Sequence, residues 1–91
     1  MTPLKSYQQK YHSNLVTRDP DKLKYYNRQR VGAIIANARR KQGLTLRELA
    51  ERSGVSYQNI TKIEKGKYNV SIDILGKLCR ALGLKIDLNE Y

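Results

Sequence analysis

Apolar residues recur at helical spacing along most of this chain, and the pattern predicts a series of helices. A first helix begins at Thr2-Pro3, where a hydroxyl residue suited to the N-cap precedes a proline. A second begins at Asp19-Pro20 for the same reason and extends toward Gly43, with its continuity through residues 27–30 left open. Their apolar faces are Leu4, Tyr7, Tyr11 and Leu15 in the first, and Leu23, Tyr26, Ile34, Ile35 and Ala38 in the second.

Three further helix starts share one arrangement. Each has a hydroxyl residue at the N-cap, an apolar residue just before it and another four positions after it, a hydrophobic staple that fixes how the chain enters the helix. The caps are Thr45, Ser56 and Ser71, and the staples are Leu44 with Leu49, Val55 with Ile60, and Val70 with Leu75. Thr45 and Glu48 add a capping box. The helices should end at left-handed glycines, which are Gly54, Gly66 and Gly83.

The end of the chain follows a different period. Leu84, Ile86 and Leu88 alternate with polar residues, which is typical of a strand. A single strand cannot satisfy its own backbone, so an identical strand of a second copy is the simplest partner. The alternative is a frayed tail.

Charge then indicates the kind of partner. The chain has 18 Lys and Arg against 8 Asp and Glu, a net charge of +10, and residues 1–44 hold +8 of it. A basic excess of this size attracts polyanions. Binding to a membrane surface would require a strong apolar helix face beside the basic one, whereas the basic segments here are interleaved with Gln, Asn and Tyr. Nucleic acid is therefore the favoured partner.

Other classes of function find little support in the sequence. With 91 residues, one domain is expected, and neither a long apolar run nor a signal peptide is present, which favours a cytoplasmic protein. The lone Cys79 and lone His12 offer no metal site, so no metal or other cofactor is expected. Cys79 is interpreted as a core residue, with a redox sensor as the alternative. Without a catalytic set of side chains, the chain is not expected to be an enzyme.

The segment TLRELAERSGVSYQNITKIEKG, residues 45–66, resembles the helix-turn-helix of the phage-repressor and Cro type, also called the XRE family. The wedge between the two helices is Leu49, Val55, Ile60 and Ile63. Ala50 is small where the helices cross, and Gly54 supplies the positive φ of the turn. The resemblance extends from about Val31 to Leu84.

This resemblance implies an all-α fold, a compact helical bundle of the lambda-repressor-like type. The sequence pattern adds a helical N-terminal extension over residues 1–25 and a short C-terminal strand or tail over residues 85–91. The DNA-binding domain between them spans residues 26–84.

In such a motif the second helix lies in the major groove, and the residues near its N-terminus contact base edges. By position these base-contacting residues are Tyr57, Gln58, Asn59, Thr61 and Lys62. Gln58 is suited to a bidentate contact with adenine, and Lys62 can reach guanine.

The resemblance also implies contacts with DNA phosphates and one structural ion pair. The phosphate contacts are Leu46, Arg47, Ser56, Lys65, Lys67 and Tyr68. Relatives often have a Gln that reaches a phosphate at the position of Leu46, so here the backbone N–H and Arg47 would replace that contact. Arg39 and Glu64 match the positions of a largely buried ion pair.

The resulting hypothesis is a sequence-specific regulator, a repressor, that binds double-stranded DNA as a homodimer on a pseudo-palindromic operator in the bacterial nucleoid. An antitoxin or restriction-system controller, which also binds a toxin-like or other protein partner, is the alternative within the same chemistry. From other classes, a bridging factor with a protein-interaction surface and an RNA binder that uses the basic arm remain open.

Overall fold

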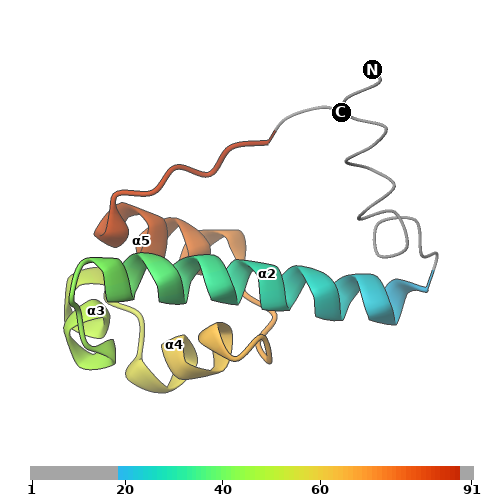
Figure 1. The fold of residues 1–91 in the computed structure, drawn as a ribbon, viewed down its shortest axis with the longest axis horizontal. Helices are drawn as coiled ribbons and strands as arrows, with labels where there is room; N and C mark the ends of the chain where they lie inside the picture. Colours follow the sequence, from blue (N-terminus) through green and yellow to red (C-terminus); the bar gives the residue numbers. More distant parts are fainter. Residues whose placement is uncertain (1–18, 89–91) are drawn as a thin grey trace.

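The computed structural model describes residues 19–88, which form four helices. They are α2 (Pro20–Lys41), α3 (Leu46–Ser53), α4 (Tyr57–Glu64) and α5 (Ile72–Leu82). In Figure 1, α2 runs along the long axis of the molecule, with α5 on one side of it and α4 on the other. The helix predicted from Thr2-Pro3 lies outside the described residues.

Helix α2 starts where the sequence predicts. The side chain of Asp19 accepts a hydrogen bond of 3.0 Å from the N–H of Asp21, and Pro20 occupies the first helical position. The helix is unbroken through residues 27–30, the stretch whose continuity the pattern left open. It also runs continuously across residues 25 and 26, where the predicted N-terminal extension ends and the predicted DNA-binding domain begins.

The three predicted hydroxyl caps are confirmed. The side chains of Thr45, Ser56 and Ser71 each accept a backbone N–H from three residues later, at 3.0, 3.2 and 3.1 Å respectively. At the start of α3 the capping box is complete, because Glu48 Oε1 also accepts the N–H of Thr45 at 2.8 Å. Helices α3 and α5 end at Gly54 and Gly83, with φ of 76° and 71°. These caps make three short helices possible in quick succession.

All four helices contribute to one apolar core. Its most deeply buried side chains are Ile35, Leu49, Ile60, Ile63 and Leu78. Burying a side chain of this size stabilises the fold by roughly 1.5 to 3 kcal/mol. The wedge predicted between the two motif helices, Leu49, Val55, Ile60 and Ile63, lies wholly within this core.

A glycine brings α2 against α4. A side chain at Gly32 would collide with the backbone carbonyl of Ile63, one of the last residues of α4. Only a residue without a Cβ permits this approach. The backbone of α2 therefore directly supports the end of α4.

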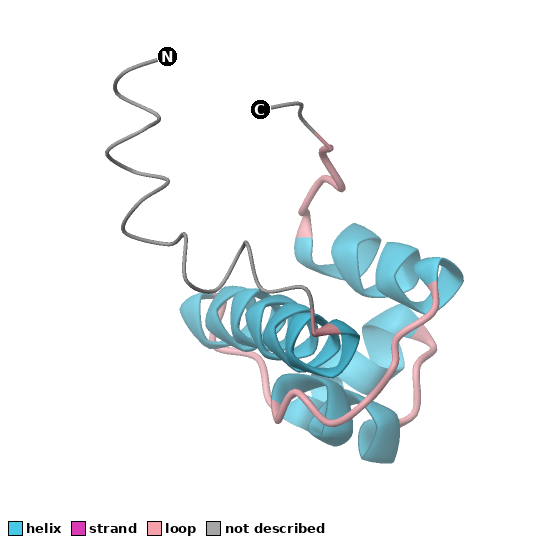
Figure 2. Cartoon of the chain, turned by 90° about the vertical axis from the view of Figure 1, so that its right-hand side faces the viewer, coloured by secondary structure: helices cyan, strands magenta, loops and turns pink. Residues whose placement is uncertain are grey.

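The predicted C-terminal strand is wrong for the residues that the structure describes. Residues 84–88 form no strand and are drawn as a loop in Figure 2. The N–H of Leu84 donates to the carbonyl of Cys79 at 2.8 Å, which continues the cap of α5, and the Leu84 side chain packs against the core. Beyond it, Ile86 and Leu88 are 43% and 91% exposed. The alternation of apolar residues thus comes from one anchoring residue and two exposed ones.

Candidate nucleic-acid interface

An ion pair fixes the end of α4 to α2. Arg39 donates from Nε to Glu64 Oε2 at 2.7 Å and from Nη2 to Glu64 Oε1 at 3.0 Å, so the pair is bidentate. A third bond of 2.8 Å runs from Arg39 Nη1 to the carbonyl of Leu44, just before α3. The two charged side chains are 12% and 9% exposed, and the hydrogen bond with Glu64 raises the pKa of Arg39. One side chain thus ties together α2, the turn before α3 and the end of α4.

The two faces of α4 differ sharply. Ile60 and Ile63 are buried in the core, whereas Tyr57, Gln58 and Lys62 are exposed. Gln58 and Lys62 are four residues apart, so they are neighbours on the helix surface. The polar face of α4 therefore presents an amide and an ammonium group side by side.

Asn59 and Thr61 are turned partly toward the protein. Both are half-buried, and Thr61 Oγ1 donates to the carbonyl of Tyr57 at 3.0 Å. Ser56 is exposed, but its hydroxyl accepts the N–H of Asn59 as the helix cap. Of the predicted contacts on α4, Tyr57, Gln58 and Lys62 are thus the most accessible.

Arg47 and Tyr57 are joined by a contact that the sequence did not predict. The guanidinium carbon of Arg47 lies 4.8 Å from the centroid of the Tyr57 ring, a distance typical of a cation–π contact. Arg47 is in the first turn of α3 and Tyr57 begins α4. The resemblance places Arg47 at a phosphate and Tyr57 at a base, and no spacing rule indicates that the starts of these two helices meet. The cation–π interaction therefore links a residue predicted to bind phosphate to a residue predicted to bind a base.

The remaining predicted phosphate contacts lie at the start of α3 and in the loop after α4. The Leu46 side chain packs partly against the core, and its backbone N–H, in the first turn of α3, has no acceptor within the helix. Lys65 and Lys67 are exposed and Tyr68 is half-buried. The loop turns at Gly66, with φ of 73°, and the N–H of Lys67 donates to the carbonyl of Lys62 at 2.9 Å. Both regions therefore have a defined backbone.

Cys79 is the single cysteine of the chain, and it lies within the described residues. Cys79 is buried, and burial raises the pKa of its thiol. The described residues contain no group of three side chains that could hold a metal ion. None of the four helices is long and apolar enough to cross a membrane.

A family model described as helix-turn-helix matches residues 35–89, more than half of the chain. The chain belongs to this helix-turn-helix family. The match includes α3 and α4, the two helices whose geometry is described above, and it leaves out the first turns of α2.

Known helix-turn-helix proteins agree with this assignment. An HTH-type transcriptional regulator of Methanothermobacter thermautotrophicus is 46% identical over 50 residues, covering 55% of this chain and 72% of the relative. One from Methanocaldococcus jannaschii is 39% identical over 67 residues, covering 74% of this chain and 83% of the relative. Transcriptional regulator ClgR of Mycobacterium tuberculosis is 36% identical over 61 residues, covering 67% of this chain and 54% of that protein.

A solved structure has the same fold. The crystal structure of the clp gene regulator ClgR from Corynebacterium glutamicum matches with a TM-score of 0.60 and 42% identity, over 63% of this chain and 61% of that one. This chain therefore spans a little more than half of the ClgR proteins. Family, relatives and fold together assign this helix-turn-helix chain to DNA-binding transcription regulation.

Proposed function

We propose that this chain recognises a specific operator by placing α4 in the major groove and represses transcription by occupying the promoter. The observation that carries this proposal is the division of α4 into a buried face and an exposed polar face with Tyr57, Gln58 and Lys62. Recognition helices of this motif lie in the major groove with their N-terminal residues on base edges. The bonds of Arg39 to Glu64 and Leu44 support the proposal, because they hold α4 in position before DNA arrives.

Gln58 and Lys62 are the proposed base readers. A glutamine amide matches the donor and acceptor pair on the major-groove edge of adenine, and a lysine matches the two acceptors of guanine. Tyr57 contacts a thymine methyl or a phosphate, with its ring held by Arg47. Asn59 and Thr61 contribute at the edge of the contact, since both are half-buried.

Phosphates on the two flanks of the groove orient the helix. At one flank, the capping box uses the N–H groups of Thr45 and Glu48, while those of Leu46 and Arg47 have no acceptor within the helix and would bind a phosphate. At the other flank, Lys65 and Lys67 supply positive charge from the exposed loop after α4. These contacts set position, and the side chains of α4 read sequence.

Selection of bound duplexes from a random library, followed by substitution of Gln58, tests this proposal. On the enriched site, Gln58→Ala should weaken binding by ~1 to 3 kcal/mol and on random duplexes far less. Lys67→Ala should weaken both alike. Asn37→Ala, which removes an exposed amide from α2, is the matched control and should change neither. Equal losses on selected and random DNA for Gln58→Ala would contradict the role of α4 in reading sequence.

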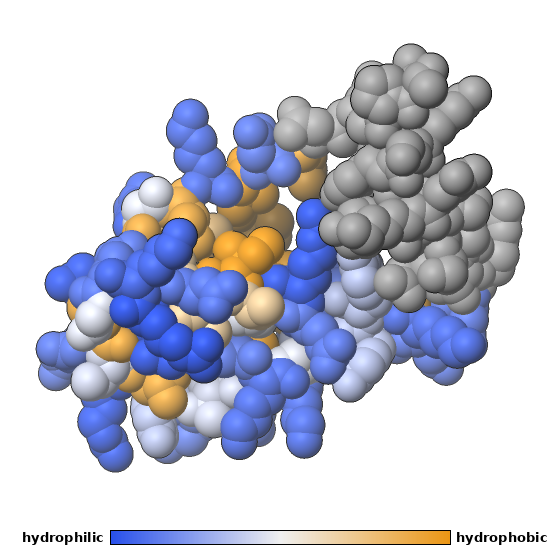
Figure 3. Space-filling view, in the orientation of Figure 1, coloured by the Kyte–Doolittle hydropathy of each residue, from blue (hydrophilic) through white to orange (hydrophobic). Residues whose placement is uncertain are grey.

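The operator is proposed to be pseudo-palindromic and bound by a homodimer. Supporting this, apolar side chains surround an open hollow of about 360 Å³ between α2, α5 and the C-terminal segment, visible as the apolar patch in Figure 3. Ile34, Ile86 and Leu88 at this hollow are all exposed. A second copy would cover these side chains and place two copies of α4 on successive turns of one DNA face.

Sedimentation tests the homodimer. Ile34→Glu should convert a dimer to a monomer and weaken binding to the selected operator much more than to random DNA, because two linked half-site contacts become independent. Ile72→Glu is the matched control, since Ile72 is 67% exposed and does not line the hollow. A wild-type monomer, or a dimer that Ile34→Glu leaves intact, would contradict this interface.

A further inference from the structure

The face of α2 that meets α4 continues beyond it. Gly32 lies against the backbone of the last residues of α4, and at spacings of three and four residues toward the N-terminus the same face contains Gln29, Tyr25 and Lys22. From Gln29 back to Pro20, the helix extends about 14 Å at 1.5 Å per residue. These turns precede residues 35–89, which match the helix-turn-helix family.

The loop after α4 rests on this part of α2. A side chain at Gly66 would collide with Gln29, so the backbone of the loop touches α2 there. Arg28 lines a hollow of about 210 Å³ together with Tyr68 and Asn69 of the same loop. The loop that supplies Lys65 and Lys67 is therefore continuous in space with the N-terminal turns of α2.

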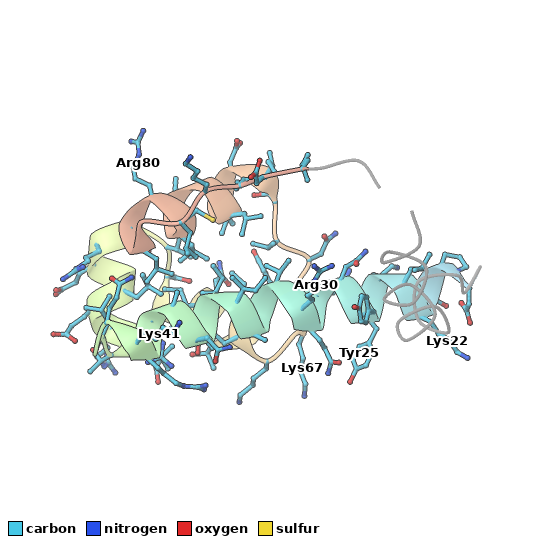
Figure 4. All side chains as sticks on the ribbon, turned by 45° about the horizontal axis from the view of Figure 1, so that its top comes forward. Lys22, Tyr25, Arg30, Lys41, Lys67 and Arg80 are labelled. Atoms are coloured by element: carbon cyan, nitrogen blue, oxygen red, sulfur yellow. The ribbon has the colours of Figure 1, made fainter. Side chains whose placement is uncertain are left out.

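A hydrogen-bond donor is held at the surface of these turns. Gln29 Nε2 donates to the hydroxyl oxygen of Tyr25 at 2.8 Å, and because a phenol can accept and donate at once, the hydroxyl proton stays available. The Tyr25 side chain is 58% exposed and Lys22 is also exposed. In Figure 4 the side chains of Lys22, Tyr25 and Lys67 point to the same side of α2, and Arg80 points to the opposite side.

We propose that Tyr25 and Lys22 form a second phosphate site, which binds the backbone of duplex DNA next to the phosphates held by the loop after α4. The Tyr25 hydroxyl donates to a phosphate oxygen, and the Lys22 ammonium neutralises its charge. Duplex DNA is the occupant because basic residues outnumber acidic ones in this part of the chain, with Lys22, Lys24, Arg28 and Arg30 against Asp19 and Asp21. The site also carries a donor and continues the loop proposed to bind phosphate. This inference rests on the proposed operator binding and lengthens its footprint along the DNA.

The test uses the full chain and a random-sequence duplex of about 30 base pairs, since a phosphate contact carries no sequence information. Lys22→Gln should weaken binding about fivefold at about 0.1 M salt, and raising the salt to about 0.3 M should reduce this difference about threefold, as expected for one lost counterion release. Lys22→Arg should keep wild-type affinity. Tyr25→Phe should weaken binding with an unchanged salt slope, because it removes a donor and no charge.

Arg80→Gln is the matched control, as it removes one exposed charge from the opposite side of the molecule. Circular dichroism should show equal helix content for all variants. If Lys67→Gln weakens binding while Lys22→Gln behaves like Arg80→Gln and Tyr25→Phe like wild type, the second phosphate site is overturned and the operator proposal stands. A wild-type chain that binds no duplex would overturn both.

Discussion

The two sides of this helical domain expose opposite kinds of side chain. On the α3–α4 side, the aliphatic residues Leu49, Ile60 and Ile63 are buried, whereas Gln58 and Lys62 are exposed. On the side formed by α2, α5 and the C-terminal segment, Ile34, Ile86 and Leu88 are exposed around one hollow. Single exposed apolar residues are ordinary, but a group around a hollow favours contact with another protein surface. This difference supports the proposal that the α3–α4 side contacts DNA and that the other side contacts a protein surface.

The two sides also differ in how they are held. On the α3–α4 side, Arg39 makes three hydrogen bonds, and the start of α3 is closed by a capping box. On the other side, Gln42 Nε2 donates to the carbonyl of Leu82 at 2.8 Å, and the backbone of Leu84 bonds to that of Cys79. These bonds fix where the C-terminal segment begins. The α3–α4 side should therefore depend on its polar contacts for stability.

The largest effect is expected at the ion pair between α2 and α4. Arg39→Met should lower the free energy of unfolding by roughly 3 to 5 kcal/mol, because it leaves the carboxylate of Glu64 buried without its partner. The double variant Arg39→Met, Glu64→Leu should lose less than the single one, since no charge is stranded. Urea unfolding of Arg39→Met, of Glu64→Leu and of the double variant measures the coupling between the two residues. Losses that simply add would contradict the coupling.

The next effect concerns the contact of the α2 backbone with α4. Gly32→Ala should destabilise the fold by about 1 to 3 kcal/mol, because a Cβ there collides with the carbonyl of Ile63 and the two helices must separate. Gly76→Ala is the matched control in α5, where a Cβ meets nothing within 4 Å, and it should stabilise by up to about 1 kcal/mol through helix propensity. Thermal unfolding should therefore shift in opposite directions. A shift of the same sign for both would contradict the close approach.

The local sequence predicted most of the fold because its signals are short in range. An N-terminal signal such as Thr45 or Pro20 needs only the residues that follow it, and the C-cap Gly54 needs only the residues that precede it. The strand failed for a physical reason: alternation describes which residues could share a face, but a strand also requires a hydrogen-bonding partner. In residues 84–88, the backbone of Leu84 bonds to the end of α5 instead.

The candidate site was predicted less completely. The resemblance to known repressors supplied the proposed DNA contacts, which stay predictions, and the pair of Arg39 with Glu64, a bond that joins residues 25 positions apart. It could not supply the contact of Arg47 with Tyr57, because such contacts depend on how two helices cross. The contact of Gln29 with Gly66 could not be predicted for the same reason, and Gln29 lies outside residues 35–89, the part of the chain that matches the family.

A smaller effect is expected for the contact of Arg47 with Tyr57. In a double-mutant cycle with Arg47→Gln and Tyr57→Leu, the coupling in the free energy of unfolding should be about 0.5 to 1 kcal/mol, the value for an exposed cation–π contact. Arg52→Gln, in the last turn of α3, is the control and should show no coupling to Tyr57→Leu. Coupling of equal size for both arginines would mean that general charge, and not stacking, links α3 to α4.

The smallest effect is expected at the capping box of α3, and it depends on pH. The hydrogen bond with the backbone of Thr45, followed by the smaller effect of its side chain, lowers the pKa of Glu48. The Glu48 carboxylate is fully exposed. Because the pKa in the folded state is below that in the unfolded state, the ionised carboxylate stabilises the fold at pH values above the ordinary carboxyl pKa. This contribution disappears as the pH falls through the lowered pKa. The melting temperature should therefore respond to Glu48 at neutral pH and not in acid.

Glu48→Gln separates the charge from the hydrogen bond, because glutamine can also accept the N–H of Thr45 in a capping box. Its melting temperature should lie slightly below that of the wild type at neutral pH, and the two should converge once the pH is below the lowered pKa of Glu48. Glu51→Gln removes an equal charge from the same helix outside the capping box, so its difference from wild type should vary less over the same pH range. If Glu51→Gln and Glu48→Gln follow the same curve, the loss reflects net charge alone, and the cap does not depend on the ionised carboxylate.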